Sequence, residues 1–595
     1  MAGPRGDRVP GLAVASGGRM LRAMSAPAET VTVHHTHRTE LDAAVGELRA
    51  RRAAWVAAPV SARIAILDEL MHGVFRSADR WVAACLAEEG LDPRTPASAE
   101  ETLVGPYLTL RNLRLLRRSL VDIERYGAPR IPGGTHTLPD GRVAARVMPT
   151  DRFDRLMYSR ASAEVWMQPG VTRETLPSTQ ALAYRSPDEG GVCLVLGAGN
   201  VSSIAPLDAV YRLFVHNRVV ILKTHPTLAF MGPILEEALG ALIRGGYLRI
   251  VHGGAVEGAH LVHHPGVDEV HITGSDRTYE TIVFGGGADG LERKQRDEPI
   301  MAKPFSAELG NVTPIIVVPG RWSEAGIGVQ ADSVASMLTN NAGFNCTAAR
   351  MIITPAGWRL RQRFLGAVRA RLAATPVRSA FYPGAQERFD SFMGVHPEAE
   401  LYGERTDDKL PWALISDLDP ARRDEMCFTT EAFCSITGEV PIQSEGVPDY
   451  LERAVTFANE SLWGTLNATL IVDPRAALDP QVGPAVERAV ADLRYGTVGV
   501  NHWSGIGYAL GVTPWGAFPG HHRTDIGSGM GVVHNTLMFS RSQKTVVRGP
   551  FRPRPKPIWF ASHRSAHRVA RQMLAFERSP SLWRVAGMLP RAMRG

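Results

Sequence analysis

The chain has few cysteines and no long apolar run, and each absence excludes a class of protein. Its five cysteines stand far apart among 595 residues, at positions 85, 193, 346, 427 and 434. Without a Cys-x-x-Cys pair or a Cys/His cluster of zinc-finger spacing, neither a disulfide scaffold nor a structural metal is indicated, and we predict no metal ligand. No stretch of eighteen uncharged apolar residues occurs, so we expect no transmembrane helix and a cytoplasmic location.

The composition is that of an ordinary globular protein, with 44% hydrophobic and 21% charged residues. A chain of this length can form two or three domains. The formal net charge of +6 is unevenly distributed, because residues 548–595 hold eleven Lys and Arg against a single acid, Glu577. The rest of the chain is therefore net acidic, and we expect no nucleic-acid binding by the main body.

The first residues lack the apolar core of a secretory signal. Residues 1–24 are rich in Gly, Arg and Ala, with four arginines against Asp7. We interpret 1–37 as a flexible leader. Two alternatives stay open: Met24 is the true start, or the segment is a targeting presequence.

The remaining pattern predicts helices followed by two series of buried strands. Residues 38–125 have apolar positions at helical spacing, and 141–168 alternate as extended structure does. Short apolar runs, each followed by a helical or Gly-rich stretch, then predict parallel βαβ units. The first series of strand candidates is 192–196, 219–222, 249–251 and 269–272. The second is 313–318, 351–354, 413–415, 435–440, 469–472 and 499–501.

Cys346 stands among small and polar residues in the stretch 340–350, Asn-Asn-Ala-Gly-Phe-Asn-Cys-Thr-Ala-Ala-Arg. A nucleophilic cysteine needs a close backbone whose amides can bind an oxyanion, and Gly343 permits a tight approach. An inert packing cysteine is the alternative. Further segments accompany it in a fixed order: Gly197–Asn200, Lys223, Gly253–Gly258, Ile272–Ser275, Phe305–Asn311, Glu431–Phe433, Asn459–Gly464, Gly496–Asn501 and Pro514–Gly520.

This order of motifs resembles the aldehyde dehydrogenase superfamily over roughly residues 38–545. The resemblance implies an α/β fold with two consecutive Rossmann-type α/β/α domains and a small β oligomerisation element. It implies a cofactor-binding domain 38–300 with a β oligomerisation excursion near 141–168, a catalytic domain 301–505, a return segment 506–547 and a basic C-terminal extension 548–595.

The resemblance also implies roles for single residues. Cys346 is the expected nucleophile, Asn200 the oxyanion donor and Glu308 the general base that activates water. An ordinary turn asparagine and a solvated surface glutamate are the alternatives for the last two. The cofactor-binding residues it implies are Lys223, Gly253, Gly258, Gly274, Ser275, Glu431 and Phe433.

Several positions depart from the family pattern. Phe344 stands where Gln is usual, Arg350 arrives one residue early, and Cys434-Ser435 replace Gly-Pro. Thr224-His225-Pro226 replaces Pro-Ser-Glu, which removes the carboxylate that holds the ribose 2′-hydroxyl, so the cofactor is NAD or NADP. Extra residues between Ser275 and Glu308, including a charged run at 292–298, predict a surface insertion.

The predicted function is NAD(P)-dependent oxidation of an aldehyde to a carboxylic acid through a thiohemiacetal and a thioester. One alternative is a CoA-dependent acyl-CoA reductase; another is a non-catalytic member of the superfamily. The resemblance implies a homodimer or homotetramer. For the basic extension we weigh a peripheral membrane contact through 556–595, packing onto the core or a neighbouring subunit, and disorder.

Overall fold

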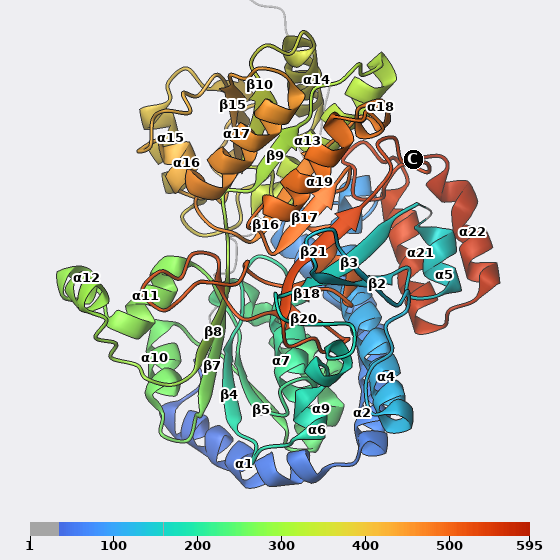
Figure 1. Ribbon diagram of the computed structural model, residues 1–595. Helices are drawn as coiled ribbons and strands as arrows, with labels where there is room; N and C mark the ends of the chain where they lie inside the picture. Colours follow the sequence, from blue (N-terminus) through green and yellow to red (C-terminus); the bar gives the residue numbers. More distant parts are fainter. Residues whose placement is uncertain (1–34, 159) are drawn as a thin grey trace, which may run out of the picture. The chain divides into compact units, whose positions relative to one another are not determined.

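Two large sheets organise the part of the chain that the computed structural model describes, residues 35–158 and 160–595 (Figure 1). The predicted leader lies outside the described residues except for positions 35–37. By their contacts, Val33–Gly595 form one unit, so the C-terminal extension belongs to the same body as both sheets.

The first sheet is built from near-continuous apolar strands. It has the order β19-β8-β7-β4-β5-β6, and all neighbouring strands except the β19–β8 pair run parallel. Its strands are β4 (Val192–Leu196), β5 (Val219–Lys223), β6 (Leu248–Val251), β7 (Glu269–Gly274), β8 (Phe305–Leu309) and β19 (Gly529–Met530). Strands covered on both faces need apolar residues throughout, which explains why the first series of strand predictions is confirmed.

The second sheet joins a parallel centre to an antiparallel edge. Its order is β1-β2-β3-β21-β17-β16-β9-β10-β15-β14-β12. The strands are β1 (Thr135–Thr137), β2 (Val143–Met148), β3 (Ser162–Met167), β9 (Pro314–Val317), β10 (Met351–Pro355), β12 (Glu400–Tyr402), β14 (Trp412–Ile415), β15 (Ile436–Ile442), β16 (Asn467–Ile471), β17 (Thr497–Val500) and β21 (Ser542–Arg548). The second strand series is thereby confirmed. The predicted extended segment 141–168 is confirmed in β2 and β3, but Arg152–Met157 between them forms the short helix α5.

The helices are amphipathic or buried and cover the two sheets. The longer ones are α1 (Arg38–Ala57), α2 (Val60–Glu88), α4 (Leu108–Tyr126), α7 (Ile204–Phe214), α10 (Ala255–His263), α11 (Asp276–Phe284), α12 (Gly287–Arg296), α13 (Glu324–Thr339), α14 (Arg361–Ala374), α15 (Ala385–Val395), α17 (Val447–Glu460), α19 (Val482–Asp492), α21 (Ala566–Arg578) and α22 (Leu582–Ala592). No described helix is both long and apolar enough to cross a membrane.

Short elements complete the chain. The short α-helices are α3 (Ala99–Thr102), α5 (Arg152–Met157), α6 (Leu182–Arg185), α8 (Gly232–Ala238), α9 (Gly240–Arg244), α16 (Met426–Thr429), α18 (Pro474–Ala477) and α20 (Ile506–Leu510). Other helical turns are η1 (Pro96–Ser98), η2 (Leu103–Tyr107), η3 (Leu176–Thr179), η4 (Pro226–Met231) and η5 (Asn340–Gly343). Small strand pairs form from β11 (Arg378–Ser379) with β13 (Lys409–Leu410) and β18 (Pro514–Trp515) with β20 (Val533–His534).

The return segment 506–547 connects the two sheets. Its strand β19 pairs with β8, where Gly529 lies opposite Glu308, and β21 then inserts between β3 and β17 of the second sheet. The predicted boundary at residue 300 precedes β8, which pairs with β7 in the first sheet. The change of sheet therefore comes after Leu309, and Glu308 is carried by the cofactor-side sheet.

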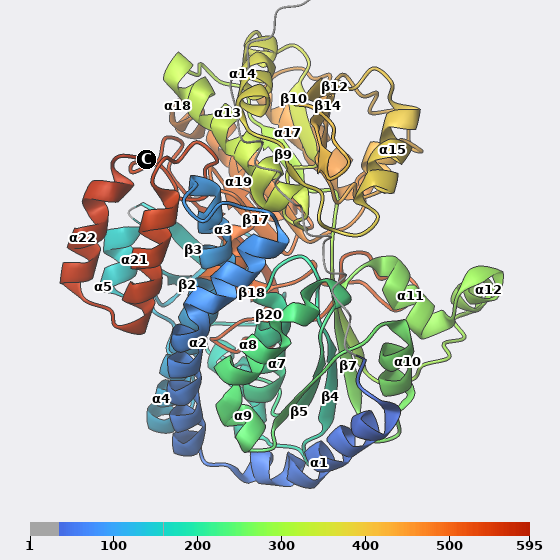
Figure 2. The ribbon, with the colours of Figure 1, turned by 180° about the vertical axis from the view of Figure 1, so that it is seen from behind.

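The C-terminal extension packs onto the core rather than leaving it. Helix α21 contacts α3, η1, η2 and α4, and α22 lies against α21 and α5 (Figure 2). The single acid of the extension, Glu577, is fully buried and accepts hydrogen bonds from Arg111 at 3.2 Å and Arg114 at 2.6 Å. Of the three interpretations of the extension, the contacts of α21 agree with packing onto the core.

Candidate active site

The loop before Cys346 has a left-handed backbone over three consecutive residues. Asn341, Ala342 and Gly343 have φ of 51°, 53° and 85°. Gly343 is required sterically, since a Cβ there would lie 2.6 Å from the carbonyl oxygen of Cys434. Non-glycine residues in this region cost free energy and persist only where the surroundings hold them.

Arg350 supplies much of that support. Its buried guanidinium donates to the carbonyl oxygens of Gly343 and Cys434, and to that of Ile436 at 3.2 Å. Burial lowers the pKa of Arg350, with the nearby Glu431 charge opposing. The arginine that arrives one residue early thus fastens the Cys346 loop to the start of β15.

A second set of hydrogen bonds holds the backbone of Cys346. Its carbonyl oxygen accepts from Asn467 Nδ2 at 3.1 Å and Thr313 Oγ1 at 3.3 Å. Asn467 Nδ2 also donates to Asn311 Oδ1 at 3.1 Å, so the end of the Glu308 motif joins the network. Because every member has a partner, this buried network fixes the position of the sulfur.

Cys346 differs from the other cysteines in exposure. It is partly exposed, whereas Cys85, Cys193, Cys427 and Cys434 are buried. Burial of the thiol raises the pKa of Cys346 well above its ordinary value, and the carboxylates of Glu308 and Glu431 raise it further. The resting sulfur is therefore a protonated thiol that needs a base to become a nucleophile.

Glu308 is the base within reach. Its carboxylate is buried at the end of β8 and accepts a hydrogen bond from Trp515 Nε1 at 2.9 Å. Burial raises the pKa of Glu308 to about 8, opposed by the Trp515 hydrogen bond and by hydrogen bonding from the Cys346 thiol. The structure therefore brings together the two residues that the sequence separates by 38 positions, and the solvated-surface alternative for Glu308 is wrong.

Asn200 also reaches the cysteine loop, but its amide is engaged. Asn200 Nδ2 donates to the carbonyl oxygen of Phe344 at 2.9 Å, and Asn341 Nδ2 donates to the carbonyl oxygen of Asn200 at 2.9 Å. Its acceptor, Phe344, lies two residues before Cys346 in the chain. Its role as an oxyanion donor stays a prediction.

Phe344 anchors an aromatic cluster. Its ring packs against Phe381 at 5.0 Å, Tyr382 at 5.8 Å and Phe433 at 6.1 Å between centroids. This cluster is the physical reason for the departure at 344, since an apolar ring and not a glutamine amide is needed there. Phe381 and Tyr382 belong to no recognised motif, so the sequence did not predict that they pack against Phe344.

The predicted cofactor residues follow the carboxyl ends of adjacent parallel strands. Lys223 ends β5, and its Nζ donates to the carbonyl oxygen of Gly253 at 2.6 Å, just after β6. Burial lowers the pKa of Lys223, while the Glu257 charge opposes. Gly258 lies beside the same lysine, its Cβ position 3.6 Å from Lys223 Cε.

The next strand contributes a helix start. Gly274 ends β7, and Ser275 caps α11 by accepting from the backbone N–H of Thr278 at 3.2 Å. The amino ends of α10 and α11 thus face the same sheet edge as Lys223. Free N–H groups at helix starts favour anions such as a pyrophosphate.

Glu431 and Phe433 approach from the other sheet. Glu431 Oε1 is buried without a hydrogen-bond partner among the described residues, and burial raises the pKa of this carboxyl to about 7. A Cβ on Gly310 would lie 1.8 Å from Glu431 Oε2, so the carboxylate rests on that glycine. A buried ammonium, two helix starts and an unpaired carboxylate oxygen fit a dinucleotide, whose phosphates are anionic and whose riboses offer hydroxyl donors.

His225 occupies the space that a glycine leaves open. A Cβ on Gly199 would lie 2.2 Å from His225 Nδ1, and the histidine ring stacks on Tyr382 with centroids 6.0 Å apart. Burial lowers the pKa of His225 to about 4, and the Lys223 charge lowers it further. The imidazole is therefore neutral and serves as a packing surface between the two sheets.

A cavity of about 900 Å³ opens beside Cys346. Its lining includes Cys346, Asn200 and Trp515, and it extends to the helices of the C-terminal extension. Lys223 and Glu431 are not among its lining residues.

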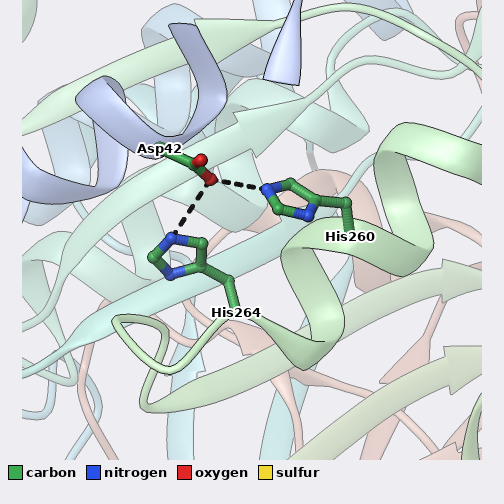
Figure 3. A group of neighbouring side chains, drawn as sticks. All are labelled: Asp42, His260 and His264. Carbon is green, nitrogen blue, oxygen red and sulfur yellow. Dashed lines mark hydrogen bonds and ion pairs between the residues drawn. The ribbon is translucent and has the colours of Figure 1, made fainter. Parts of the chain in front are cut away.

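Two groups of metal-ligand type lie elsewhere in the described chain. Asp42 of α1 accepts from His260 at 2.6 Å and contacts His264 at 3.3 Å (Figure 3). His396, Glu425 and Cys427 form the other group. The first joins α1 to α10 as an ion-pair cluster, and hydrogen bonding from His260 lowers the pKa of Asp42.

Comparison with known proteins finds sequences that are similar to this chain. Residues 153–387 match the model of the aldehyde dehydrogenase family. Betaine aldehyde dehydrogenase of Cereibacter sphaeroides is 28% identical over 310 residues, 51% of this chain and 56% of that protein. Alpha-ketoglutaric semialdehyde dehydrogenase of Acinetobacter baylyi is 33% identical over 319 residues, with 51% and 56% covered. The chain thus spans little more than half the length of these curated relatives.

Solved structures agree in fold. An NADP-dependent glyceraldehyde-3-phosphate dehydrogenase from Bacillus halodurans, complexed with NADP, superposes with a TM-score of 0.57 at 17% identity, covering 86% of this chain and 92% of that one. A mutant aldehyde dehydrogenase C from Pseudomonas syringae, complexed with NAD+ and octanal, gives 0.57 at 17% identity, covering 86% and 88%. The expected α/β fold is confirmed.

Proposed function

We propose that this chain is a member of the aldehyde dehydrogenase superfamily and oxidises an aldehyde to a carboxylic acid with NAD or NADP as acceptor, since residues 153–387 match that family and relatives of this activity are similar to it. The observation that supports this most is the pairing of Cys346 with Glu308. A partly exposed thiol and a buried carboxyl of pKa about 8 share one site at the end of an apolar cavity.

The first step is formation of a carbon–sulfur bond. The Cys346 sulfur adds to the carbonyl carbon while the thiol proton passes to Glu308. The carbonyl oxygen becomes an oxyanion, which accepts from the Asn200 side chain and a backbone N–H of the Cys346 loop. Asn200 exchanges its hydrogen bond to Phe344 for this one.

Oxidation then leaves a thioester on Cys346. A bound NAD or NADP supplies the acceptor for the hydride that departs from the aldehyde carbon. Lys223, Gly253, Gly258, Gly274 and Ser275 would hold its adenosine and phosphate side, and Glu431 and Phe433 its nicotinamide riboside. The fixed Cys346 loop keeps the carbon in place during this step.

Hydrolysis releases the acid. Glu308 passes its proton to solvent and then accepts one from the attacking water, whose oxygen bonds to the thioester carbon. The carbon–sulfur bond breaks, and the sulfur is reprotonated as the carboxylic acid leaves. A pKa near 8 lets Glu308 both release and accept a proton close to neutral pH.

The experiment follows NADH or NADPH formation from an aldehyde panel without CoA, for the wild type, Cys346→Ala and Glu308→Gln. We expect turnover to fall by more than about a thousandfold in Cys346→Ala, since the nucleophile is removed. In Glu308→Gln we expect a stalled acyl-enzyme, detectable by mass spectrometry. Cys193→Ala, a buried cysteine in β4, is the matched control and should keep its turnover.

Other outcomes separate the alternatives. Turnover that requires CoA and survives Glu308→Gln would favour an acyl-CoA reductase. No turnover with any aldehyde, with or without CoA, would favour a non-catalytic member of the superfamily.

Assembly and membrane contact are part of the same proposal. The edge strand β1 leaves the second sheet open to pairing with another copy, which supports a homodimer or homotetramer. Light scattering coupled to gel filtration tests this.

Exposed Leu582, Trp583, Leu589 and Met593 near several arginines support a peripheral membrane contact through 556–595. Sedimentation with anionic vesicles tests that contact.

A further inference from the structure

The cavity beside Cys346 has a reactive end and a distant apolar end. Cys346, Asn200 and Trp515 line the first, while Val569 and Met573 of α21 and Val585 and Met588 of α22 line the second. At about 900 Å³ it lies near the upper limit of ordinary ligand pockets, roughly 300–1,000 Å³. The C-terminal extension therefore forms part of the wall of the reaction site.

The middle of the cavity is also apolar. Leu108 of α4, Ile204 of α7 and Tyr508 of α20 belong to its lining, together with Leu103 and Val104 of η2. Such a surface gains free energy when it covers another apolar group and offers few partners to a hydroxylated or charged substrate.

The buried cations that reach the cavity are already paired. Arg111 donates to Asp154 at 3.0 Å and to Glu577 at 3.2 Å, and Arg378 contacts Glu89 at 3.0 Å and also Glu100. Neither guanidinium is free to hold a carboxylate or phosphate on the substrate. Two further cations of the lining lie nearer to solvent: Arg554 is exposed, and half-buried Lys556 donates to Ser562 Oγ at 3.1 Å. The buried part of the cavity therefore favours a neutral, apolar aldehyde over an anionic one.

The distant wall is a fixed part of the fold. Glu577 of α21 is fully buried and joined to both Arg111 and Arg114, so the helix is tied to α4 by buried ion pairs. The ring of Phe576 packs on Phe153 with centroids 5.5 Å apart. A chain that extends from Cys346 meets an ordered surface there.

The cavity opens at α22. Leu582 and Leu589 line it and are still 54% and 56% exposed, so they stand at its rim. Exposed apolar side chains at a mouth suit an apolar ligand that enters from an apolar environment.

We infer that the substrate is an aldehyde with a long unbranched hydrocarbon chain, which fills the cavity from Cys346 to α21 and α22. This inference rests on the proposed oxidation at Cys346. The aldehyde carbon meets the sulfur, and the chain runs along the apolar wall toward the rim. Each methylene that enters the cavity raises kcat/KM by about three- to fourfold, the factor for about 0.8 kcal/mol per buried methylene.

The test compares straight-chain aldehydes from propanal to hexadecanal on the full chain. Ala586→Trp places a large ring at a position of α22 that is exposed and lines the cavity. Gly587→Trp is the matched control, since Gly587 is exposed, does not line the cavity and has nothing within 4 Å of its Cβ position. Binding of dodecan-1-ol, a neutral analogue of dodecanal, is measured in parallel by calorimetry without cofactor.

The expected result is a rise of kcat/KM with chain length in the wild type. Ala586→Trp lowers kcat/KM for dodecanal at least about tenfold, the loss of two buried methylenes, and leaves propanal unchanged. Gly587→Trp behaves as wild type, and only Ala586→Trp weakens dodecan-1-ol binding.

Two results overturn the inference and leave the proposed function standing. One is oxidation of propanal with kcat/KM flat across chain length; the other is equal dodecanal kinetics for Ala586→Trp and Gly587→Trp. If no aldehyde is oxidised, the proposed function fails instead. Binding of dodecan-1-ol then tests the apolar cavity independently of catalysis. Binding that is lost in Ala586→Trp supports an apolar-chain site, and absent binding in the wild type overturns it.

Discussion

At one end of the cavity the neighbours of Cys346 are hydrogen-bonding groups, whereas the end formed by α21 and α22 is apolar. Arg350, Asn467 and Thr313 hold the cysteine loop through its carbonyl oxygens. Val569, Met573 and Val585 line the other end with apolar side chains. Directional bonds fix a reacting atom in place, while apolar walls select by size and length without fixing an orientation.

The largest effect on the polar end is expected from a substitution of Gly343 in the cysteine loop. Gly343→Ala places a methyl group against the Cys434 carbonyl oxygen at a φ of 85°, so the loop must move. We expect aldehyde turnover to fall by about a hundredfold, as misplacement of a catalytic group by about 1 Å does. Steady-state kinetics measures this. Gly394→Ala, with nothing within 4 Å of its Cβ position, should match the wild type, and equal activity of both variants would contradict the prediction.

The apolar end depends on a buried charge behind it. Glu577→Gln leaves Arg111 and Arg114 without their shared carboxylate, and we expect the free energy of unfolding to fall by about 3–5 kcal/mol. Urea denaturation measures the change. Glu324→Gln breaks an exposed pair with Arg363 and should cost less than about 1 kcal/mol. A similar loss in both variants would argue against the buried network.

The pH dependence of deacylation tests the role of Glu308 at the polar end. Since the pKa of Glu308 is raised to about 8, its carboxyl is protonated below that pH and cannot accept a proton from water. Deacylation should therefore fall about tenfold per unit as pH drops below 8. Single-turnover release of the acid from the acyl-enzyme reports this limb. The limb should vanish in Glu308→Gln, and a flat wild-type profile between pH 6 and pH 8 would refute it.

The smallest effect is expected on the outer face of α22. Trp583 is 88% exposed and does not line the cavity. Trp583→Ala should change the free energy of unfolding by less than about 0.5 kcal/mol and leave aldehyde kinetics unaltered. Thermal and kinetic assays test both. A loss of dodecanal activity comparable to that of Ala586→Trp would show that the two faces of the helix are not functionally distinct.

Local patterns were enough to predict much of the scaffold. The apolar runs at 192–196, 351–354 and 469–472 are strands because parallel strands buried on both faces require uninterrupted apolar residues. Strand β8 was missed, since Phe305–Leu309 carries Ser306 and Glu308 and has no apolar run. Gly343 was correctly identified as a point of close approach.

The contacts that hold the site residues in place could not be predicted from local sequence patterns. Trp515 lay in a recognised segment, but nothing local assigned it to Glu308, 207 positions away. Arg111 and Glu577 are 466 positions apart, and an acid in a basic tail indicates nothing about burial. Such pairings depend on how the elements pack.

Most of the parallel strands, the glycine of the cysteine loop and the order of motifs that indicates the family could be predicted from local sequence, because these depend on side-chain period and backbone freedom. Two features come from the packing of the whole fold: Glu308 is a buried carboxyl of raised pKa beside Cys346, and the C-terminal extension lines a cavity. Burial and contact across hundreds of residues set the desolvation and apolar surface that produce both.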